Sequence, residues 1–322
     1  MSRLTVLLVI LTILSACEAP HKNPLDPKNP DYSFGRITGS VYTVSLPVEA
    51  VSQTLVSWPP AGQQSQTDGL GRFELLTHSV VDGWLILSHP DFRPDSVYVH
   101  WSPEKMVDFN IYLNALPQLD SLAVYSIVLN RFPSLQKEQL VVEAQISDRD
   151  NDIDSVKTRF PEQAMEFYLP YNTTTKSYLR EFSILDLAIP NLEEMVGQPL
   201  LLTVTDVYSH ATAVGQGQLV RVIHEEILTV SPDDETITGP RPTLVWLPFT
   251  VEFQFRYDIE IYTNEVAPQL VWAERGLDRY QTSFSVDTDL PDAGYFWVIW
   301  AIDSFGNRTR SKPAAFQVKE DN

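Results

Sequence analysis

The chain of 322 residues carries 42 acidic against 23 basic side chains, a formal net charge of -19, and 43% of its residues are apolar. Binding to nucleic acid needs clustered Lys and Arg that replace condensed counterions, and the sequence contains no basic stripe, so we expect no nucleic-acid partner. The apolar and aromatic content excludes a disordered chain. The length predicts two or three folded domains.

Residues 1–16 have the composition of a secretory signal peptide. Arg3 supplies a positive charge, an apolar run follows over residues 4–14, and small residues stand directly before Cys17. The run is too short to span a bilayer as a permanent helix. We therefore predict that residues 1–16 are removed on export.

Cys17 is the single cysteine of the chain, and the four residues that end at Cys17 are Leu-Ser-Ala-Cys. This sequence resembles the lipobox of bacterial lipoproteins, in which the cysteine is joined to diacylglycerol. An exported protein with one cysteine has no disulfide partner, which also favours an attachment role. The alternative is an ordinary signal peptide with a chance cysteine. The resemblance implies a protein held on the bacterial cell envelope by lipidated Cys17, and we expect the outer membrane or the cell surface.

Residues 17–34 are rich in proline and predict an extended tether. Residues 35–116 follow with predicted strands at 37–41, 50–56, 84–92 and 109–113. The segment from Asp68 to Gly71 predicts a tight turn that leads into an alternating strand. This order resembles the carboxypeptidase regulatory-like domain, a prealbumin-type β-sandwich. The resemblance implies no catalysis.

Residues 117–225 form the second predicted domain, with buried strands at 140–146 and 200–206 and one helical turn at 192–196. Their spacing resembles an immunoglobulin-like sandwich. In residues 226–322, apolar and polar side chains alternate strictly from Phe253 to Ile261, which predicts a strand with one buried face. Residues 290–297 resemble the tyrosine corner of fibronectin type III domains. The predicted fold class is all-β, with three consecutive β-sandwich domains after a lipoprotein signal peptide.

The first candidate site is an acidic loop, residues 148–154. Asp148, Asp150, Asp152 and Asp154 place a carboxylate at every second position, so that a loop can turn several oxygens toward calcium. In an immunoglobulin-like topology Asp206 lies at the same end of the domain and would complete the site. The alternative is that these side chains cap a turn and face water. Calcium is the one cofactor that the sequence suggests.

The second candidate site is a strand that is apolar on both faces. Alternation sends Phe296, Val298 and Trp300 to the face opposite the core, beside Arg256, which would stack on Trp300. A sandwich strand needs only one buried face, so these side chains form either a binding surface or a face that the chain itself covers.

Catalytic motifs are missing from the sequence: there is no nucleophile-elbow serine and no His-Glu-x-x-His, and the histidines are scattered singly. We predict a protein without enzymatic activity that binds or scaffolds an envelope protein or a glycan. The alternative is an accessory subunit of a polysaccharide-uptake or secretion complex. A hydrolase would need a constellation of residues that this sequence does not contain.

Overall fold

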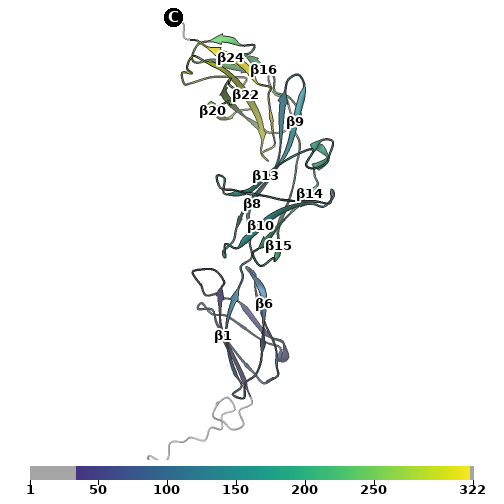
Figure 1. Cartoon of the computed structure of the whole chain (residues 1–322), viewed down its shortest axis with the longest axis vertical. Helices are drawn as coiled ribbons and strands as arrows, with labels where there is room; N and C mark the ends of the chain where they lie inside the picture. The colour runs from purple at the N-terminus through teal and green to yellow at the C-terminus, as the bar shows by residue number, and fades with distance from the viewer. Residues whose placement is uncertain (1–33, 320–322) are drawn as a thin grey trace, which may run out of the picture. The chain divides into compact units, whose positions relative to one another are not determined.

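The computed structural model describes residues 34–319, so Cys17, the predicted signal peptide and nearly all of the predicted tether lie outside the described residues. The regular elements in this range are β-strands and two short 3-10 helices, which confirms the predicted all-β fold class (Figure 1). No helix among residues 34–319 is long and apolar enough to cross a membrane. The chain divides into two compact units: the first comprises the residues up to Leu116 with 149–151, and the second comprises 117–148 with the residues from Asp152 onward.

The first unit is a sandwich of two sheets. Its strands are β1 (Gly35–Thr43), β2 (Leu55–Trp58), β3 (Gln63–Gln66), β4 (Arg72–Thr77), β5 (Gly83–His89), β6 (Phe92–Val99) and β7 (Met106–Leu113), with the 3-10 helix η1 (Pro59–Ala61) after β2. The sheets have the orders β4-β1-β7 and β3-β2-β5-β6, and β1 pairs with β7 in parallel. Alternate side chains such as Ile37, Trp58 and Leu85 fill the core. The strand expected over 50–56 begins only at Leu55, and Ala50 before it forms an isolated bridge with Tyr42.

The turn before β4 has the predicted chemistry. Asp68 Oδ1 accepts hydrogen bonds from the amides of Leu70 and Arg72 at 2.9 and 2.8 Å. Gly71 has a φ of +74°, and a Cβ atom at this position would lie 2.4 Å from the carbonyl oxygen of Val41. Only glycine fits this combination of backbone conformation and close approach.

The second unit begins with another sandwich. Its strands are β8 (Gln118–Arg131), β9 (Leu135–Ser147), β10 (Ile153–Phe160), β11 (Met165–Tyr168), β12 (Tyr171–Asn172), β13 (Ser177–Ser183), β14 (Pro199–Asp206) and β15 (Ala211–Gln218). One sheet runs β11-β10-β14-β15, and strands β12-β13-β9-β8 lie on the other side of a shared core. The predicted strands at 140–146 and 200–206 are present, and the 3-10 helix η2 (Leu192–Met195) occupies the predicted helical turn.

The third hydrophobic core lies between the remaining strands. They are β16 (Thr229–Ser231), β17 (Thr236–Thr238), β18 (Thr243–Trp246), β19 (Phe255–Thr263), β20 (Leu270–Leu277), β21 (Ser283–Ser285), β22 (Gly294–Asp303), β23 (Arg308–Arg310) and β24 (Ala314–Val318). As the sequence predicts, the core side of β19 is buried, and Tyr295 closes back on the chain by donating from Oη to the carbonyl oxygen of Pro291 at 2.9 Å.

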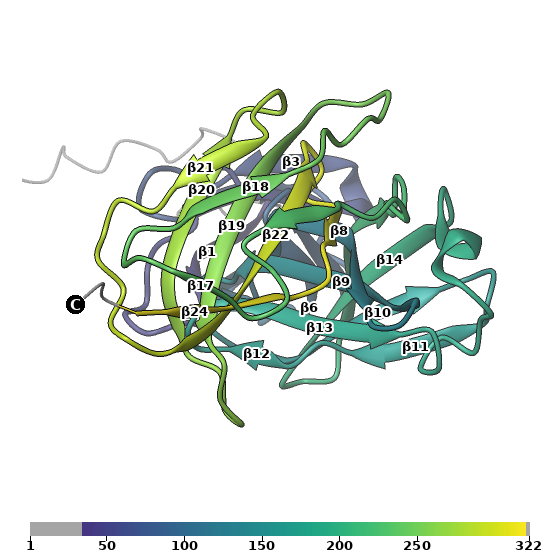
Figure 2. The same ribbon diagram turned by 90° about the horizontal axis from the view of Figure 1, so that it is seen from above.

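The second and third cores share one sheet. Strand β23 pairs in parallel with β8 on one side and antiparallel with β22 on the other, so one sheet runs from β12 to β20. Strand β24 also pairs with β22, and β17 with β24, which gives this sheet ten strands. In Figure 2, β9 and β8 lie on the same side of β22, and β23 stands between β8 and β22 in the order of the sheet. The sequence placed a domain boundary between residues 225 and 226, but the structure places both sides of it in one compact unit. The pairing of β23 with β8 joins residues such as Asn130 and Arg310, 180 positions apart, and leaves no local pattern in the sequence.

Candidate functional site

One face of the ten-stranded sheet carries side chains in cross-strand rows that span the shared region. One row contains Lys137 on β9, Leu129 on β8, Arg310 on β23, Trp300 on β22 and Asp258 on β19. The neighbouring row contains Gln139, Ile127, Arg308, Ile302 and Arg256. We call these residues, together with Tyr125 and Arg131 on the same side of β8, the junction face.

Strand β8 holds the junction face on one side and core on the other, because successive side chains of a strand point to opposite faces. Tyr125, Ile127 and Leu129 are partly exposed, whereas Ser126, Val128 and Asn130 between them are buried. The alternation continues in β23, where Arg308 and Arg310 flank buried Thr309. The strands that carry the cations of the junction face are therefore held by the buried side chains on their opposite face.

Arg310 is the central cation of the junction face. Its guanidinium lies 5.7 Å from the ring centroid of Trp300, and its Nε is buried without a hydrogen-bond partner. Burial, and after it the charge of Arg131, lower the pKa of Arg310 from its usual value. The hydrogen-bonding capacity of this guanidinium, which has five N–H donors, is thus incompletely used.

Three other cations surround Arg310. The guanidinium of Arg308 lies 4.6 Å from the ring centroid of Tyr125, and its Nε donates to the carbonyl oxygen of Gly306 at 3.3 Å. Arg131 and Lys137 are exposed. Across residues 34–319, none of these four cations forms an ion pair with a carboxylate. The face is therefore locally basic in a chain of net charge -19.

A buried carboxylate cluster borders Trp300. Glu260 Oε2 accepts hydrogen bonds from Trp300 Nε1 at 2.8 Å and Tyr262 Oη at 2.9 Å, and Arg275 Nη2 lies 2.7 Å from Oε1. Burial alone would raise the pKa of Glu260, but these three donors hold the pKa below its ordinary value. Burial and the Glu260 carboxylate raise the pKa of Tyr262 to about 12. Glu260 is therefore ionised, and it anchors one side of the Trp300 ring.

The sequence left open whether the outer face of β22 is a binding surface or is covered by the chain itself, and in the structure the chain covers much of it. Val298 is fully buried, Trp300 is partly buried, and Phe296 stacks on Tyr262 with ring centroids 5.4 Å apart. Arg256 is exposed on the neighbouring strand as expected, but its Nε lies 3.9 Å from Asp258 Oδ1, and the cation over Trp300 is Arg310.

The alternation predicted that β19 buries one face only, but Asp258 and Glu260 on its polar face are buried as well. Asp258 accepts a hydrogen bond from the amide of Gly276 at 2.8 Å and lies 3.4 Å from Arg275 Nη1. Carboxylates can be buried here because donors from β20 and β22 satisfy them.

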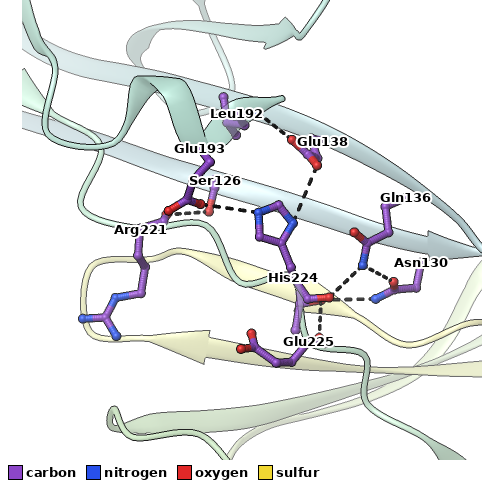
Figure 3. A network of polar contacts seen from close by, with 10 residues as sticks. Ser126, Asn130, Gln136, Glu138, Leu192, Glu193, Arg221, His224 and Glu225 are labelled. Carbon is purple, nitrogen blue, oxygen red and sulfur yellow. Dashed lines mark hydrogen bonds and ion pairs between the residues drawn. The ribbon is translucent and has the colours of Figure 1, made fainter. Parts of the chain in front are cut away.

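The connection between the second and third cores is fixed by a polar network behind the junction face (Figure 3). Gln136 Nε2 donates to Asn130 Oδ1 at 2.9 Å and to the carbonyl oxygen of His224 at 2.7 Å. The ring nitrogens of His224 lie 3.6 Å from Glu138 Oε1 and 3.4 Å from Glu193 Oε2. The connecting segment is thereby tied at His224 to β9 and η2, and through Gln136 to β8.

Buried contacts also join β23 to β8. Asn130 Nδ2 donates to the carbonyl oxygen of Arg310 at 2.9 Å, and Asn307 Oδ1 accepts from the amide of Ser126 at 2.9 Å. In the segment between β15 and β16, Arg221 Nε also lies 3.2 Å from the buried carboxylate of Asp303 at the end of β22. A buried polar group without a partner costs ~1–3 kcal/mol, so these reciprocal contacts favour one relative arrangement of the two strands.

The aspartates of the acidic loop have separate environments. Asp148 Oδ2 accepts from the amide of Asp152 at 3.1 Å, Asp154 is exposed, and Asp150 accepts from the amide of Ala115 within the first unit. No group of three or more His, Cys, Asp or Glu side chains within residues 34–319 is placed to hold a metal ion.

Asp206 lies at the expected end of its domain, directly opposite Ile153 in the pairing of β14 with β10. Its Oδ1 accepts hydrogen bonds from the amides of Tyr208 and His210 at 2.9 and 2.8 Å. Burial would raise the pKa of Asp206, but the hydrogen bonds from His210 lower it below the ordinary value. Asp206 therefore lies beside the acidic loop, as the sequence predicted. Its carboxylate caps the turn that follows β14. Calcium binding by this loop stays a prediction.

Sequence reasoning missed two features. Arg308, Arg310 and Lys312 stand at every second position, which is the pattern of a strand with one basic face. In the first unit, Trp84 and Tyr98 oppose each other across β5 and β6 with 53% and 45% of their surface exposed. The signal for this pair was the run over residues 84–87, which is apolar on both faces of its strand.

Comparison with known proteins finds similar folds at low sequence identity. No family model matches the chain, and no curated protein matches it. The fibronectin(III)-like modules of CbhA from Clostridium thermocellum match with a TM-score of 0.30 and 10% identity, covering 64% of this chain and 94% of theirs. The FN1–FN3 domains of chicken CNTN1 match with a TM-score of 0.33 and 10% identity, over 84% and 92% of the two chains. BcpA, the major pilin subunit of Bacillus cereus, matches with a TM-score of 0.27 and 9% identity, over 90% and 96%.

Proposed function

We propose that this chain is a lipid-anchored protein of the bacterial cell envelope that binds or scaffolds a partner without catalysing a reaction. The anchor rests on Cys17, the single cysteine of the chain, and on the lipobox-like residues before it. Several acyl chains on one cysteine would make the attachment effectively permanent, since each buried methylene contributes about 0.8 kcal/mol.

The observation that carries the binding role is the junction face. Arg131, Lys137, Arg308 and Arg310 lie on one side of a continuous sheet and form no ion pair with a carboxylate within residues 34–319. Charges that stabilised only the fold would be expected to pair with some of the many carboxylates of this acidic chain. Cations that are held in place but left unpaired are suited to an external anion.

The anchor is tested with Cys17→Ser in the native host, followed by detergent phase partitioning of cell extracts. We expect the wild type in the detergent phase and the variant in the aqueous phase or unprocessed. Thr5→Ser, a conservative change in the same leader, serves as the control and should leave the partitioning unchanged. A Cys17→Ser variant that stays in the detergent phase would contradict the proposed anchor. Protease treatment of intact cells then separates a surface location from a periplasmic one.

The second candidate is an accessory subunit of a polysaccharide-uptake or secretion complex. The basic junction face favours it, because such a subunit must hold a chain or a partner by side-chain contacts rather than by catalysis. Chemical cross-linking in intact cells followed by purification of the chain tests this candidate. A stoichiometric membrane transport partner would support it, and recovery of the chain without one would favour the independent binding protein.

A further inference from the structure

The junction face is suited to a ligand with repeated negative charges. In the row through Trp300, Lys137 and Arg310 stand two strands apart. In the neighbouring row Arg308 and Arg256 have the same separation, but Arg256 already pairs with Asp258. Neighbouring strands are about 4.8 Å apart, which places successive cations of a row about 10 Å apart. Apolar side chains lie between them.

The acidic side chains near the face are already engaged. Asp258 is held by Arg275 and by the amide of Gly276. On the other border, Glu181 accepts from Gln139 at 2.9 Å and Glu143 accepts from Ser177 at 2.7 Å. Glu260, whose charge also acts on Arg310, is bound by Trp300, Tyr262 and Arg275. No carboxylate within residues 34–319 forms an ion pair with Arg310, and its Nε is buried without a hydrogen-bond partner.

The position of the face within the sheet distinguishes between two kinds of anionic polymer. An extended acidic peptide commonly binds by adding a strand to an exposed sheet edge, where free backbone groups pair with it. Strands β8, β23 and β22 each have a neighbour on both sides, so the junction face offers side chains only. A ligand here must be recognised by its charges and by apolar contact with side chains such as Ile127 and Leu129.

We propose that the junction face binds an acidic polysaccharide that runs across the strands, with its carboxylates paired to Arg131, Lys137, Arg308 and Arg310. The sugar rings lie over the apolar side chains between these cations. Each contact is a charge-assisted hydrogen bond, which is stronger than a neutral one. This inference rests on the proposed binding role, but it is independent of the anchor at Cys17.

The test is a calorimetric titration of the full chain with polygalacturonate, with neutral dextran and poly-glutamate as comparison polymers. The variant Arg131→Gln/Lys137→Gln removes two exposed cations from the face. Lys176→Gln/Lys319→Gln makes the same change in net charge at exposed positions outside the face. Thermal melts of both variants check that they are folded, and Arg308→Gln provides a second variant of the face.

We expect polygalacturonate to bind and dextran not to bind. Affinity should fall about tenfold or more in the face variant, by loss of two charge-assisted contacts, and stay within about twofold in the control. Raising the salt concentration from about 50 to 200 mM should weaken binding. The proposal is overturned if polygalacturonate does not bind, if the control loses as much affinity as the face variant, or if poly-glutamate binds as tightly, which would indicate an acidic peptide. None of these results would affect the partitioning test at Cys17.

Discussion

Replacement of Trp300 by phenylalanine tests whether the Trp300–Glu260 contact stabilises the second unit. The change keeps an aromatic ring beneath Arg310 and removes the indole N–H that donates to Glu260 Oε2 at 2.8 Å. Only 12% of the Glu260 side chain is exposed, so water cannot readily replace the lost donor.

The expected loss of unfolding free energy is about 2 kcal/mol. A hydrogen bond to a charged group contributes ~1.5–3 kcal/mol, and Glu260 keeps Arg275 and Tyr262 as donors, which holds the loss below that of an unpartnered buried charge. For a unit of about 200 residues this corresponds to a fall in Tm of about 4 to 8 °C.

The assay is a thermal and urea melt of the full chain, with the transition of each unit followed separately. Trp84→Phe is the matched control, because Trp84 is 53% exposed and lies in the first unit. It should change stability by no more than about 0.5 kcal/mol, as surface substitutions usually do. A loss of less than about 0.5 kcal/mol for Trp300→Phe would show that the indole hydrogen bond contributes no stability, and the account of the carboxylate cluster would fail.

Three further outcomes are expected. The pKa of Glu260 is held below its ordinary value, so the stability that its ionised form contributes is complete above the unfolded-state pKa. This stability is lost as pH falls through the folded-state pKa. Urea melts between pH 7 and pH 3 should therefore show a steeper loss of stability for the wild type than for Glu260→Gln. Gly71→Ala combines a positive φ with a clash against backbone and should lower the unfolding free energy of the first unit by about 3 kcal/mol or more. Gly62→Ala, at φ +61° with open space around it, should lower it by about 1 kcal/mol. Equal losses would show that the clash at Gly71 does not contribute. If the acidic loop binds calcium, millimolar calcium should raise the Tm of the second unit relative to chelator, and identical melts would rule calcium out.

Much of the fold could be predicted from local patterns. The alternation in β19 identified the buried residues Phe255, Tyr257, Ile259 and Ile261, because a strand with one core face must repeat every second residue. The turn at Asp68 and the corner at Tyr295 were also recognisable, since each needs a particular residue at a particular place. These features depend on neighbours in the sequence.

The candidate site could be predicted only in part, because it depends on pairings between distant segments. The sequence identified Trp300 and the two-sided apolar pattern of its strand, but it assigned the cation over the ring to Arg256 rather than Arg310. Burial of Glu260 requires donors from three strands, which no alternation pattern records. The basic face was missed because its cations come from β8, β9 and β23. These strands bring the cations together only through their pairing, in a chain that is acidic as a whole.

The pairing of β23 with β8 has a consequence for the thermodynamics of recognition. Two sandwich domains on a flexible linker must align before a ligand can touch both, and that ordering subtracts from the affinity. Here hydrogen bonds between the strands, together with the contacts of His224 and Arg221, set the alignment during folding. A ligand that crosses from β9 to β19 therefore meets a preorganised surface, and its binding free energy is not reduced by the entropy of bringing two domains into register.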